Sequence, residues 1–171
     1  MNAQVHIFLL LIAAATIGAC SSQVEPPRVS GTMSATLQGE AWAASDAYAT
    51  FAAIGLRHEL NVAGRFLVGG LERSRVDITI ADVSGPGTYD ITNTFPFMVF
   101  INSMHVRWND ADYHVPFTSR SNLVAGSVEI AQIDVGRVRG TFHATLYRNA
   151  DPETPDTIVV AGGAFDVGIA R

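Results

Sequence analysis

The chain has 171 residues, is 48% hydrophobic and 16% charged, and carries a formal net charge of −5 at pH 7. Its eleven basic residues are all arginines and are scattered along the chain, so there is no basic patch of the kind that binds nucleic acid. The single cysteine leaves no pair for a structural disulfide, and the hydrophobic core must therefore stabilise the fold alone.

The first notable segment is an uncharged apolar run at residues 7–19, IFLLLIAAATIGA. It is too short to cross a bilayer, which takes about 20 residues, and has the length of a secretory signal core, about 7–15 residues. The run leads into IGAC at 17–20, which resembles the lipobox of bacterial lipoproteins. This resemblance implies that residues 1–19 are a signal peptide and that the thiol of Cys20 is lipidated. The preceding MNAQVH departs from this pattern because it lacks the usual Lys or Arg, and a plain signal peptide or a mis-called start is the alternative.

The lipobox resemblance also implies a location. Two or more acyl chains hold a protein stably at a membrane, at ~0.8 kcal/mol per buried methylene. Ser21 stands where lipoproteins retained in the inner membrane often carry an aspartate, so the resemblance implies anchoring in the outer membrane of a bacterial cell envelope. Residues 20–30 are mostly polar and contain Pro26-Pro27, which indicates a flexible tether behind the lipidated cysteine.

From residue 31 onward, apolar and polar residues alternate with the period of β-strands. The clearest segments are 75–82, 126–132 and 140–147, and turn-forming residues separate them. The pattern predicts one all-β domain over residues 31–171. We expect a single antiparallel β-sandwich or flattened barrel of about 8–10 strands, connected mostly as a meander. A lipocalin-like barrel is the alternative, and it would enclose a ligand cavity.

Two apolar segments contain candidate ligand-binding residues. The alternation over 54–62 places His58 among inward-facing apolar side chains, where a hydrogen-bonded core or strand-end histidine is the simpler interpretation. The segment FPFMVFI at 95–101 is apolar on both faces of a strand, as in a central strand covered on both sides. The functional alternative is a cavity lined by His58, Phe97 and Phe100, since ligand sites are mostly apolar with a few polar groups.

The densest group of polar side chains lies in MHVRWNDADYHV, residues 104–115. A hairpin that turns at 109–112 would place Trp108 opposite Tyr113 on an apolar face. The same hairpin would place Arg107 opposite His114 on the other face, with His105 two residues along.

This hairpin also contains weak candidates for metal ligands, His105, His114, Asp110 and Asp112. Imidazole and carboxylate groups suit transition metals. However, Arg107 between the histidines would repel a cation, and the spacing matches no tight ligand set. A solvated hairpin face is the preferred interpretation, and we expect neither a metal nor another cofactor.

No recognised catalytic motif for a hydrolase, metalloprotease or nucleotide-binding enzyme is present. Asp134, followed by Val135-Gly136, is interpreted as a turn residue that accepts hydrogen bonds from nearby backbone. Two carboxylates could still be brought together by a β fold, as glycoside hydrolysis requires. The sequence therefore favours a protein without catalytic activity and leaves an unrecognised hydrolase as an alternative.

Five stretches together resemble a family of bacterial lipid-anchored all-β proteins of unknown function. Their shared pattern is Gly-x-x-Trp, then Gly-Thr-Tyr, an Ile-x-x-x-Asp strand, Gly-Thr-Phe and a final glycine-phenylalanine strand. The resemblance spans about residues 31–169 and implies the β class and the lipid anchor, without an activity or a binding site. The stretches are MSATLQGEAWAA (33–44), GPGTYDIT (85–92), GSVEIAQID (126–134), VRGTFHATL (138–146) and VVAGGAFDVGI (159–169).

The residues of this pattern also have physical interpretations. Trp42, Tyr89 and Phe142 are expected to point inward as large packing anchors. Gly87 and Gly140 are expected to permit turns or bulges that a side chain would strain.

These observations favour a membrane-anchored envelope lipoprotein that binds a small apolar ligand or an envelope protein without catalysis. A structural envelope protein without a pocket and an unrecognised hydrolase are the alternatives. A lined cavity would favour ligand binding, an exposed apolar patch would favour a protein partner, and paired carboxylates in a cleft would favour the enzyme.

Overall fold

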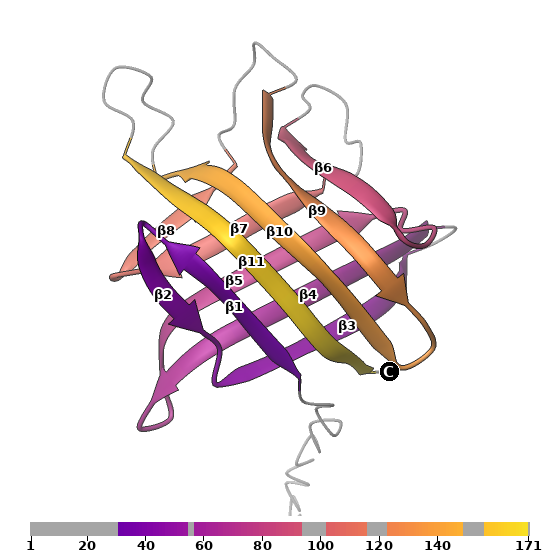
Figure 1. Ribbon diagram of the computed structural model, residues 1–171, viewed down its shortest axis with the longest axis horizontal. Helices are drawn as coiled ribbons and strands as arrows, with labels where there is room; N and C mark the ends of the chain where they lie inside the picture. Colours follow the sequence, from indigo (N-terminus) through magenta and orange to yellow (C-terminus); the bar gives the residue numbers. More distant parts are fainter. Residues whose placement is uncertain (1–30, 55–56, 94–101, 116–122, 149–155, 171) are drawn as a thin grey trace, which may run out of the picture.

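The computed structural model describes residues 31–54, 57–93, 102–115, 123–148 and 156–170 (Figure 1). All regular secondary structure in these ranges is β-strand, which confirms the predicted all-β class. None of the described residues belongs to a helix with the length and apolar character needed to span a membrane. The strands are β1 Thr32–Leu37, β2 Glu40–Ala43, β3 Asp46–Ile54, β4 Arg57–Val68, β5 Leu71–Ala81, β6 Gly87–Asn93, β7 Ser103–Trp108, β8 Ala111–His114, β9 Leu123–Ile133, β10 Arg137–Tyr147 and β11 Thr157–Ala170.

The strands form two layers that cross face to face (Figure 1). The front layer has the order β2-β1-β11-β10-β9-β6, and the rear layer has the order β3-β4-β5-β7-β8. One corner joins the layers where β11 pairs in parallel with β3, through Ile169 opposite Ala49. The other corner joins β10 to β8, through Tyr147 opposite His114.

The two corners close a ring of hydrogen-bonded strands, because β10 and β11 also pair with each other. A sandwich or flattened barrel was predicted, and this two-layered closed arrangement confirms that class. The described residues form eleven strands, slightly more than expected, and β3 pairs with β11 in parallel within an otherwise antiparallel sheet. Strands that are neighbours in the chain are mostly neighbours in the sheet, as in a meander. The exception is β6, which follows β5 in the chain but lies in the front layer, where it pairs with β9.

The side chain of Asn102 connects the two layers where the chain passes from β5 to β6. Its Oδ1 accepts a hydrogen bond from the backbone N–H of Ala81 at 2.9 Å, and its Nδ2 donates to the carbonyl oxygen of Asp90 at 3.0 Å. One side chain therefore connects the end of β5 in the rear layer with β6 in the front layer.

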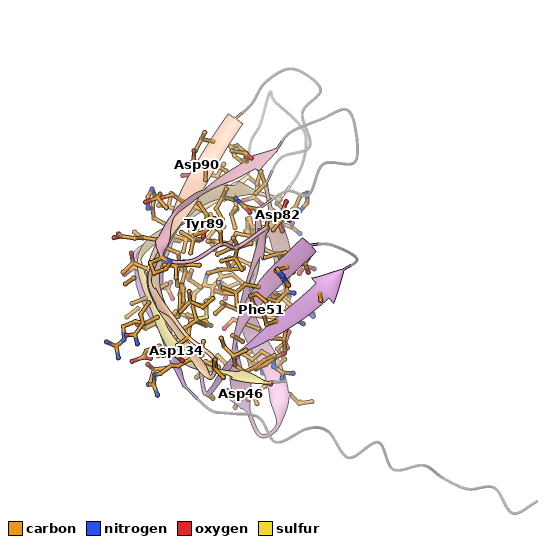
Figure 2. The ribbon with its side chains drawn as sticks, turned by 90° about the vertical axis from the view of Figure 1, so that its right-hand side faces the viewer. Asp46, Phe51, Asp82, Tyr89, Asp90 and Asp134 are labelled. Atoms are coloured by element: carbon orange, nitrogen blue, oxygen red, sulfur yellow. The ribbon has the colours of Figure 1, made fainter. Side chains whose placement is uncertain are left out.

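Alternating side chains fill the space between the layers (Figure 2). In β10, Phe142, Ala144 and Leu146 are buried, while Thr141 and His143 between them are exposed, as the sequence pattern predicted. The predicted inner faces of β5 and β9 are also buried. Burying one aliphatic or aromatic side chain contributes about 1.5–3 kcal/mol, so this alternation is the main source of stability. The buried residues of those two strands are Val76, Ile78, Ile80, Val128 and Ile130.

The predicted aromatic anchors point inward. Trp42 is 5% exposed, and its indole Nε1 donates to the hydroxyl of Ser74 at 2.8 Å, which satisfies two buried polar groups at once. Phe142 is buried in the core. Tyr89 is half-buried, and its hydroxyl donates to the carbonyl oxygen of Gly85 at 2.7 Å, which fastens the turn before β6.

Glycines and phenylalanines alternate across β10 and β11. Gly140 pairs with Phe165, and Phe142 pairs with Gly163, so each ring lies over the glycine of the other strand. A Cβ on Gly140 would come within 2.6 Å of the Phe165 ring, and a Cβ on Gly163 within 2.5 Å of the Phe142 ring. The register of β9 and β10 also shifts between Arg139 and Gly140, which agrees with the predicted bulge.

Candidate functional site

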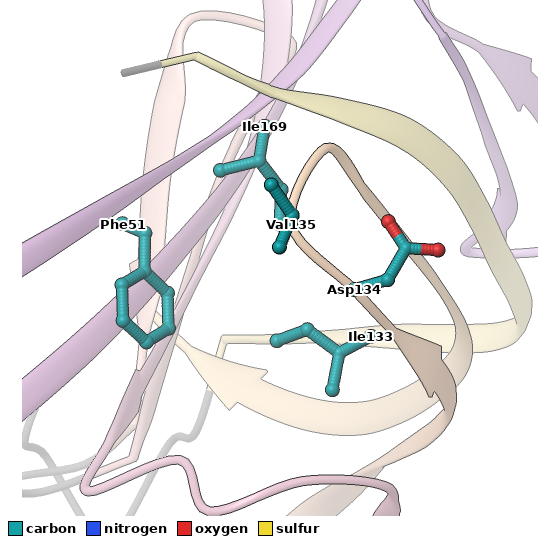
Figure 3. A pocket seen from close by; sticks show the side chains of 5 residues that line it. All are labelled: Phe51, Ile133, Asp134, Val135 and Ile169. Carbon is teal, nitrogen blue, oxygen red and sulfur yellow. The ribbon is translucent and has the colours of Figure 1, made fainter.

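A pocket of about 630 Å³ opens at one end of the space between the layers (Figure 3). We call it the rim pocket and define it by five residues from three regions of the chain. Phe51 comes from β3, Ile133 from the end of β9, Asp134 and Val135 from the β9–β10 turn, and Ile169 from β11. Four of these five side chains are apolar, and the pocket is open to solvent.

The rim pocket lies where the described pairing of β3 with β11 ends. The described pairing between β3 and β11 stops at Thr50 and Ala170, but β3 continues to Ile54 alongside β4. Ala49 points into the core on β3 and is fully buried, whereas Phe51, the next inward position, is 39% exposed. Phe51 therefore adds exposed aromatic surface to the mouth of an apolar hollow, and small-molecule sites are commonly lined in this way.

His58 does not line the rim pocket, but it stacks against Phe51, which does. The two rings stack with centroids 5.5 Å apart and an interplanar angle of 24°. His58 continues the face on which Leu60 and Val62 are buried, but it is exposed because it lies near the start of β4, at the open end of the layers. The structure therefore brings one predicted ligand-binding residue to the edge of the pocket. A ligand contact by His58 remains a prediction, and the other two predicted residues, Phe97 and Phe100, lie outside the described residues.

Asp134 is the one charged residue that lines the rim pocket within the described chain. Its Oδ1 accepts hydrogen bonds from the backbone N–H groups of Gly136 and Arg137, both at 3.0 Å, and its Oδ2 accepts one from Gln132 Nε2 at 3.2 Å. The hydrogen bond from Gly136, followed by that from Arg137, lowers the pKa of Asp134 below its usual range, so the carboxylate is ionised at neutral pH. Figure 3 shows this carboxylate directed away from Phe51. The interpretation of Asp134 as a turn residue is thus confirmed, and its oxygens are occupied by its own turn.

In the β7–β8 hairpin, the register of the two strands differs from the predicted one. The turn has two residues, Asn109 and Asp110, with φ of 49° and 61°, as in a type I′ turn. The prediction assumed a four-residue turn, and its pairing of Trp108 with Tyr113 is wrong because the shorter turn shifts the register. Trp108 pairs with Ala111, and Tyr113 pairs with Val106.

The two faces of this hairpin are nevertheless as expected. Trp108 and Tyr113 pack against the core. Arg107 pairs with Asp112 rather than with His114, and His114 pairs with His105 instead.

The hairpin face carries ion pairs rather than a ligand set for a metal. His105 Nε2 lies 3.1 Å from Asp112 Oδ1, and its Nδ1 lies 3.5 Å from Asp77 Oδ2, a carboxylate that also pairs with Arg75. The hydrogen bond to Asp77, and then the charge of Asp112, raises the pKa of His105. A histidine favoured in its protonated form is a poor metal ligand. Within the described residues, no group of three or more His, Cys, Asp or Glu side chains could hold a metal ion.

A second hollow, of about 520 Å³, lies on the outer face of the front layer. Its lining includes Asp90, Ser127 and His143, which the registers of β6, β9 and β10 place in one row. In a hydrolytic triad the histidine lies between the nucleophile and the carboxylate, whereas here Ser127 occupies the middle. No hydrogen bond joins these three side chains in the described part of the chain. The row therefore lacks the arrangement that would activate Ser127.

Paired carboxylates, the other signature of a hydrolase, are not found in either hollow as far as the described lining extends. Each hollow contains one, Asp134 in the rim pocket and Asp90 in the second hollow. Glycoside hydrolysis needs two carboxyl groups about 5–10 Å apart across one cleft. The geometry of the described residues thus gives no support to the hydrolase alternative.

Sequence reasoning missed four residues of the rim pocket, Phe51, Ile133, Val135 and Ile169. Alternation could have marked Phe51 and Ile169 as inward positions of long strands. The missing information was where each strand loses its partner, which depends on the parallel pairing of β3 with β11. No short-range pattern encodes a pairing between segments so far apart in the chain.

Comparisons of this chain with models of known protein families, with curated proteins and with solved structures find no match.

Proposed function

We propose that the protein is an envelope lipoprotein, anchored through Cys20 in the outer membrane of a bacterium, whose β domain binds a small apolar ligand in the rim pocket without catalysis. The observation that carries the ligand-binding part is the pocket itself, about 630 Å³ with four apolar residues among the five that line it. Small-molecule sites in proteins are concave, mostly apolar and about 300–1,000 Å³ in volume. The anchor is supported by the apolar run and by the IGAC segment at 17–20.

The character of the lining supports an apolar ligand. Hydrogen bonds from Gln132, Gly136 and Arg137 hold the carboxylate of Asp134 in its own turn, and it is directed away from Phe51 (Figure 3). Ile133 and Ile169 contribute aliphatic surface to the pocket, beside the exposed ring of Phe51. Contact with such surface favours a ligand through the removal of apolar area from water.

An envelope protein is the second candidate for the occupant. Val135 is 73% exposed at the tip of the β9–β10 turn, so an apolar side chain of a partner could pack against it and reach Phe51. A native mass spectrum distinguishes this partner from a small ligand, because the two differ in mass.

The experiment is a native mass spectrum of the mature lipoprotein purified from its own envelope under mild conditions. We expect extra mass of small-molecule size that disappears on denaturation. Val135→Asp should remove this mass, because it places a charge at the mouth of the pocket. Val124→Asp is the matched control, since Val124 is an exposed valine, 55% accessible, in the second hollow.

Each other outcome has a defined meaning. Extra mass of protein size would replace the ligand by a protein partner. Loss of mass in the Val124 variant with retention in the Val135 variant would move the site to the second hollow. A bare chain that also fails to bind a hydrophobic fluorescent probe would contradict ligand binding and leave the structural alternative.

A further inference from the structure

The β4–β5 hairpin ends in a group of exposed apolar side chains. Residues 66–71, FLVGGL, contain no charge, and we call them the apolar tip. Phe66 is 40% exposed, Val68 49% and Leu71 64%. Gly69 and Gly70 form the turn with φ of 59° and 81°, values that suit glycine and allow the two long strands to meet tightly.

The apolar tip projects beyond its neighbours in the sheet. On one side, the pairing of β3 with β4 ends at Asp46 opposite Arg65. On the other side, the pairing of β5 with β7 ends at Arg75 opposite Arg107. Within the described chain, the tip is therefore a two-stranded extension whose exposed side chains contribute little to the core. Apolar side chains gathered on a projection mark a contact surface more often than a packing role.

The chain enters the domain beside this tip. The backbone N–H of Gly31 donates to the carbonyl oxygen of Ala47 at 3.0 Å, and Ala47 pairs with Gly64, four positions before Val68. Figure 1 shows the start of β1 and the β4–β5 turn at the same lower end of the molecule. Figure 2 places Asp46, at the base of the tip, at this end and Asp90 at the opposite end.

The length of the preceding segment limits how far this end can lie from a lipid at Cys20. Cys20 and Gly31 are about 11 residues apart, which span at most roughly 40 Å when fully extended. As a flexible coil the same segment has a mean span of about 18 Å. The apolar tip is therefore within reach of a bilayer that holds Cys20.

We propose that the apolar tip inserts into the interfacial region of the bilayer and orients the β domain on the membrane. This inference rests on the proposed lipid anchor. The occupant is lipid rather than a charged protein surface, because residues 66–71 present apolar side chains and glycine with no ion-pairing group. Because residues 66–71 carry no charge, their contact with lipid should depend on apolar burial rather than on salt.

The test uses the mature lipoprotein reconstituted into phosphatidylcholine vesicles. Once the sulfur of Cys20 carries lipid, Val68→Cys supplies one free thiol for an environment-sensitive fluorophore. Val159→Cys is the matched control, since Val159 is 46% exposed on the outer face of the front layer, away from the tip. We expect a blue shift of the label at position 68 and several-fold stronger quenching by brominated lipids than for the label at 159.

The outcomes separate this inference from the anchor on which it rests. Protein that does not float with the vesicles would refute the anchor, and the inference with it. Protein that floats but has equally solvated labels at 68 and 159 would overturn the tip alone. A blue shift without quenching by brominated lipid would also overturn it, because it would indicate contact with a second copy of the chain. Leu71→Cys with the same control repeats the test if the first variant does not fold.

Discussion

At the scale of single residues, His105 is a titratable group whose surroundings favour its charged form. It lies on the outer face of the rear layer, between the carboxylates of Asp77 and Asp112. Arg75 forms an ion pair with the same Asp77, and His114 pairs with His105 across the hairpin. The hydrogen bond to Asp77 raises the pKa of His105 above its ordinary value of about 6.5. A group whose pKa is raised on folding stabilises the folded state fully below its unfolded pKa, and this contribution is lost as pH rises through the folded pKa.

We therefore expect the stability advantage of the unaltered protein over His105→Gln to shrink as the pH rises above about 6.5. The difference in the free energy of unfolding should lie within the roughly 0.2–1 kcal/mol of exposed ion pairs. Urea denaturation at a series of pH values measures it. His143→Gln, an exposed histidine on the other layer with no ion pair to the described residues, is the control. A pH-independent difference for His105→Gln would contradict the assignment.

The hydrogen bond between Trp42 and Ser74 is the second residue-scale test. Ser74 is the one buried polar or charged side chain of the described core, and it is 3% exposed. Trp42→Phe or Ser74→Ala alone leaves a buried polar group without this partner, which costs about 1–3 kcal/mol. The double variant should cost about 1 kcal/mol less than the sum of the two single variants. Urea denaturation of all four proteins gives this coupling, and strict additivity would show that the bond contributes nothing.

At the scale of elements, β10 and β11 depend on two reciprocal glycine–phenylalanine pairs. Gly140→Ala would place a Cβ 2.2 Å from the carbonyl oxygen of Glu129 and 2.6 Å from the Phe165 ring. Since backbone on one side and a core ring on the other must move, we expect a loss of about 1–3 kcal/mol in the free energy of unfolding.

Gly136→Ala is the matched control for this loss. Gly136 precedes the same strand in the β9–β10 turn, and a Cβ there meets nothing within 4 Å. It should change stability by less than about 1 kcal/mol, in the stabilising direction, because alanine restricts the unfolded chain. Thermal or urea unfolding compares the two, and equal effects would show that the close contacts at Gly140 are relieved without cost.

The β7–β8 hairpin shows what an element reveals from its own sequence. Which side chains share a face follows from alternation, and both faces were predicted correctly. Which side chains oppose each other follows from the length of the turn, and that was wrong. Asn109 and Asp110 both adopt positive φ, so a two-residue turn replaced the expected four-residue one.

At the scale of the whole molecule, the domain has its rim pocket and its apolar tip in separate places. The pocket lies where the described pairing of β11 with β3 ends. The tip lies where β4 and β5 extend beyond their described pairings with β3 and β7. Figure 1 shows the C-terminal end of β11 at the same lower end as the start of β1, and Figure 2 places Asp134 toward Asp46, so the two features occupy different parts of one end of the domain. Both proposals depend on where the chain is attached.

The attachment is tested by Cys20→Ser. We expect this variant to incorporate no radiolabelled fatty acid and to keep its signal segment, because the modification and the cut before residue 20 depend on the thiol. Labelling in cells followed by electrophoresis measures both the lipid and the mass of the chain. Ser21→Ala is the control and should be processed normally. Unchanged labelling of the Cys20 variant would contradict the anchor and the outer-membrane location.

Local sequence patterns were sufficient to predict the all-β class, the inward faces of β5, β9 and β10, and the anchoring positions of Trp42 and Phe142. These properties depend on local alternation and side-chain size, which are read directly from neighbouring residues. The turn role of Asp134 was equally local, since its partners Gln132, Gly136 and Arg137 lie within three positions.

The remaining features could not be predicted from local patterns. The parallel pairing of β3 with β11, the passage of β6 into the other layer and the composition of the rim pocket all depend on contacts between distant segments. Phe51 looks like any other inward position in the sequence, and in the structure it lies one position beyond the described pairing of β3 with β11, beside the rim pocket. Alternation sets the face on which a side chain lies, but its burial depends on how far the neighbouring strand extends, and that is a property of the assembled sheet.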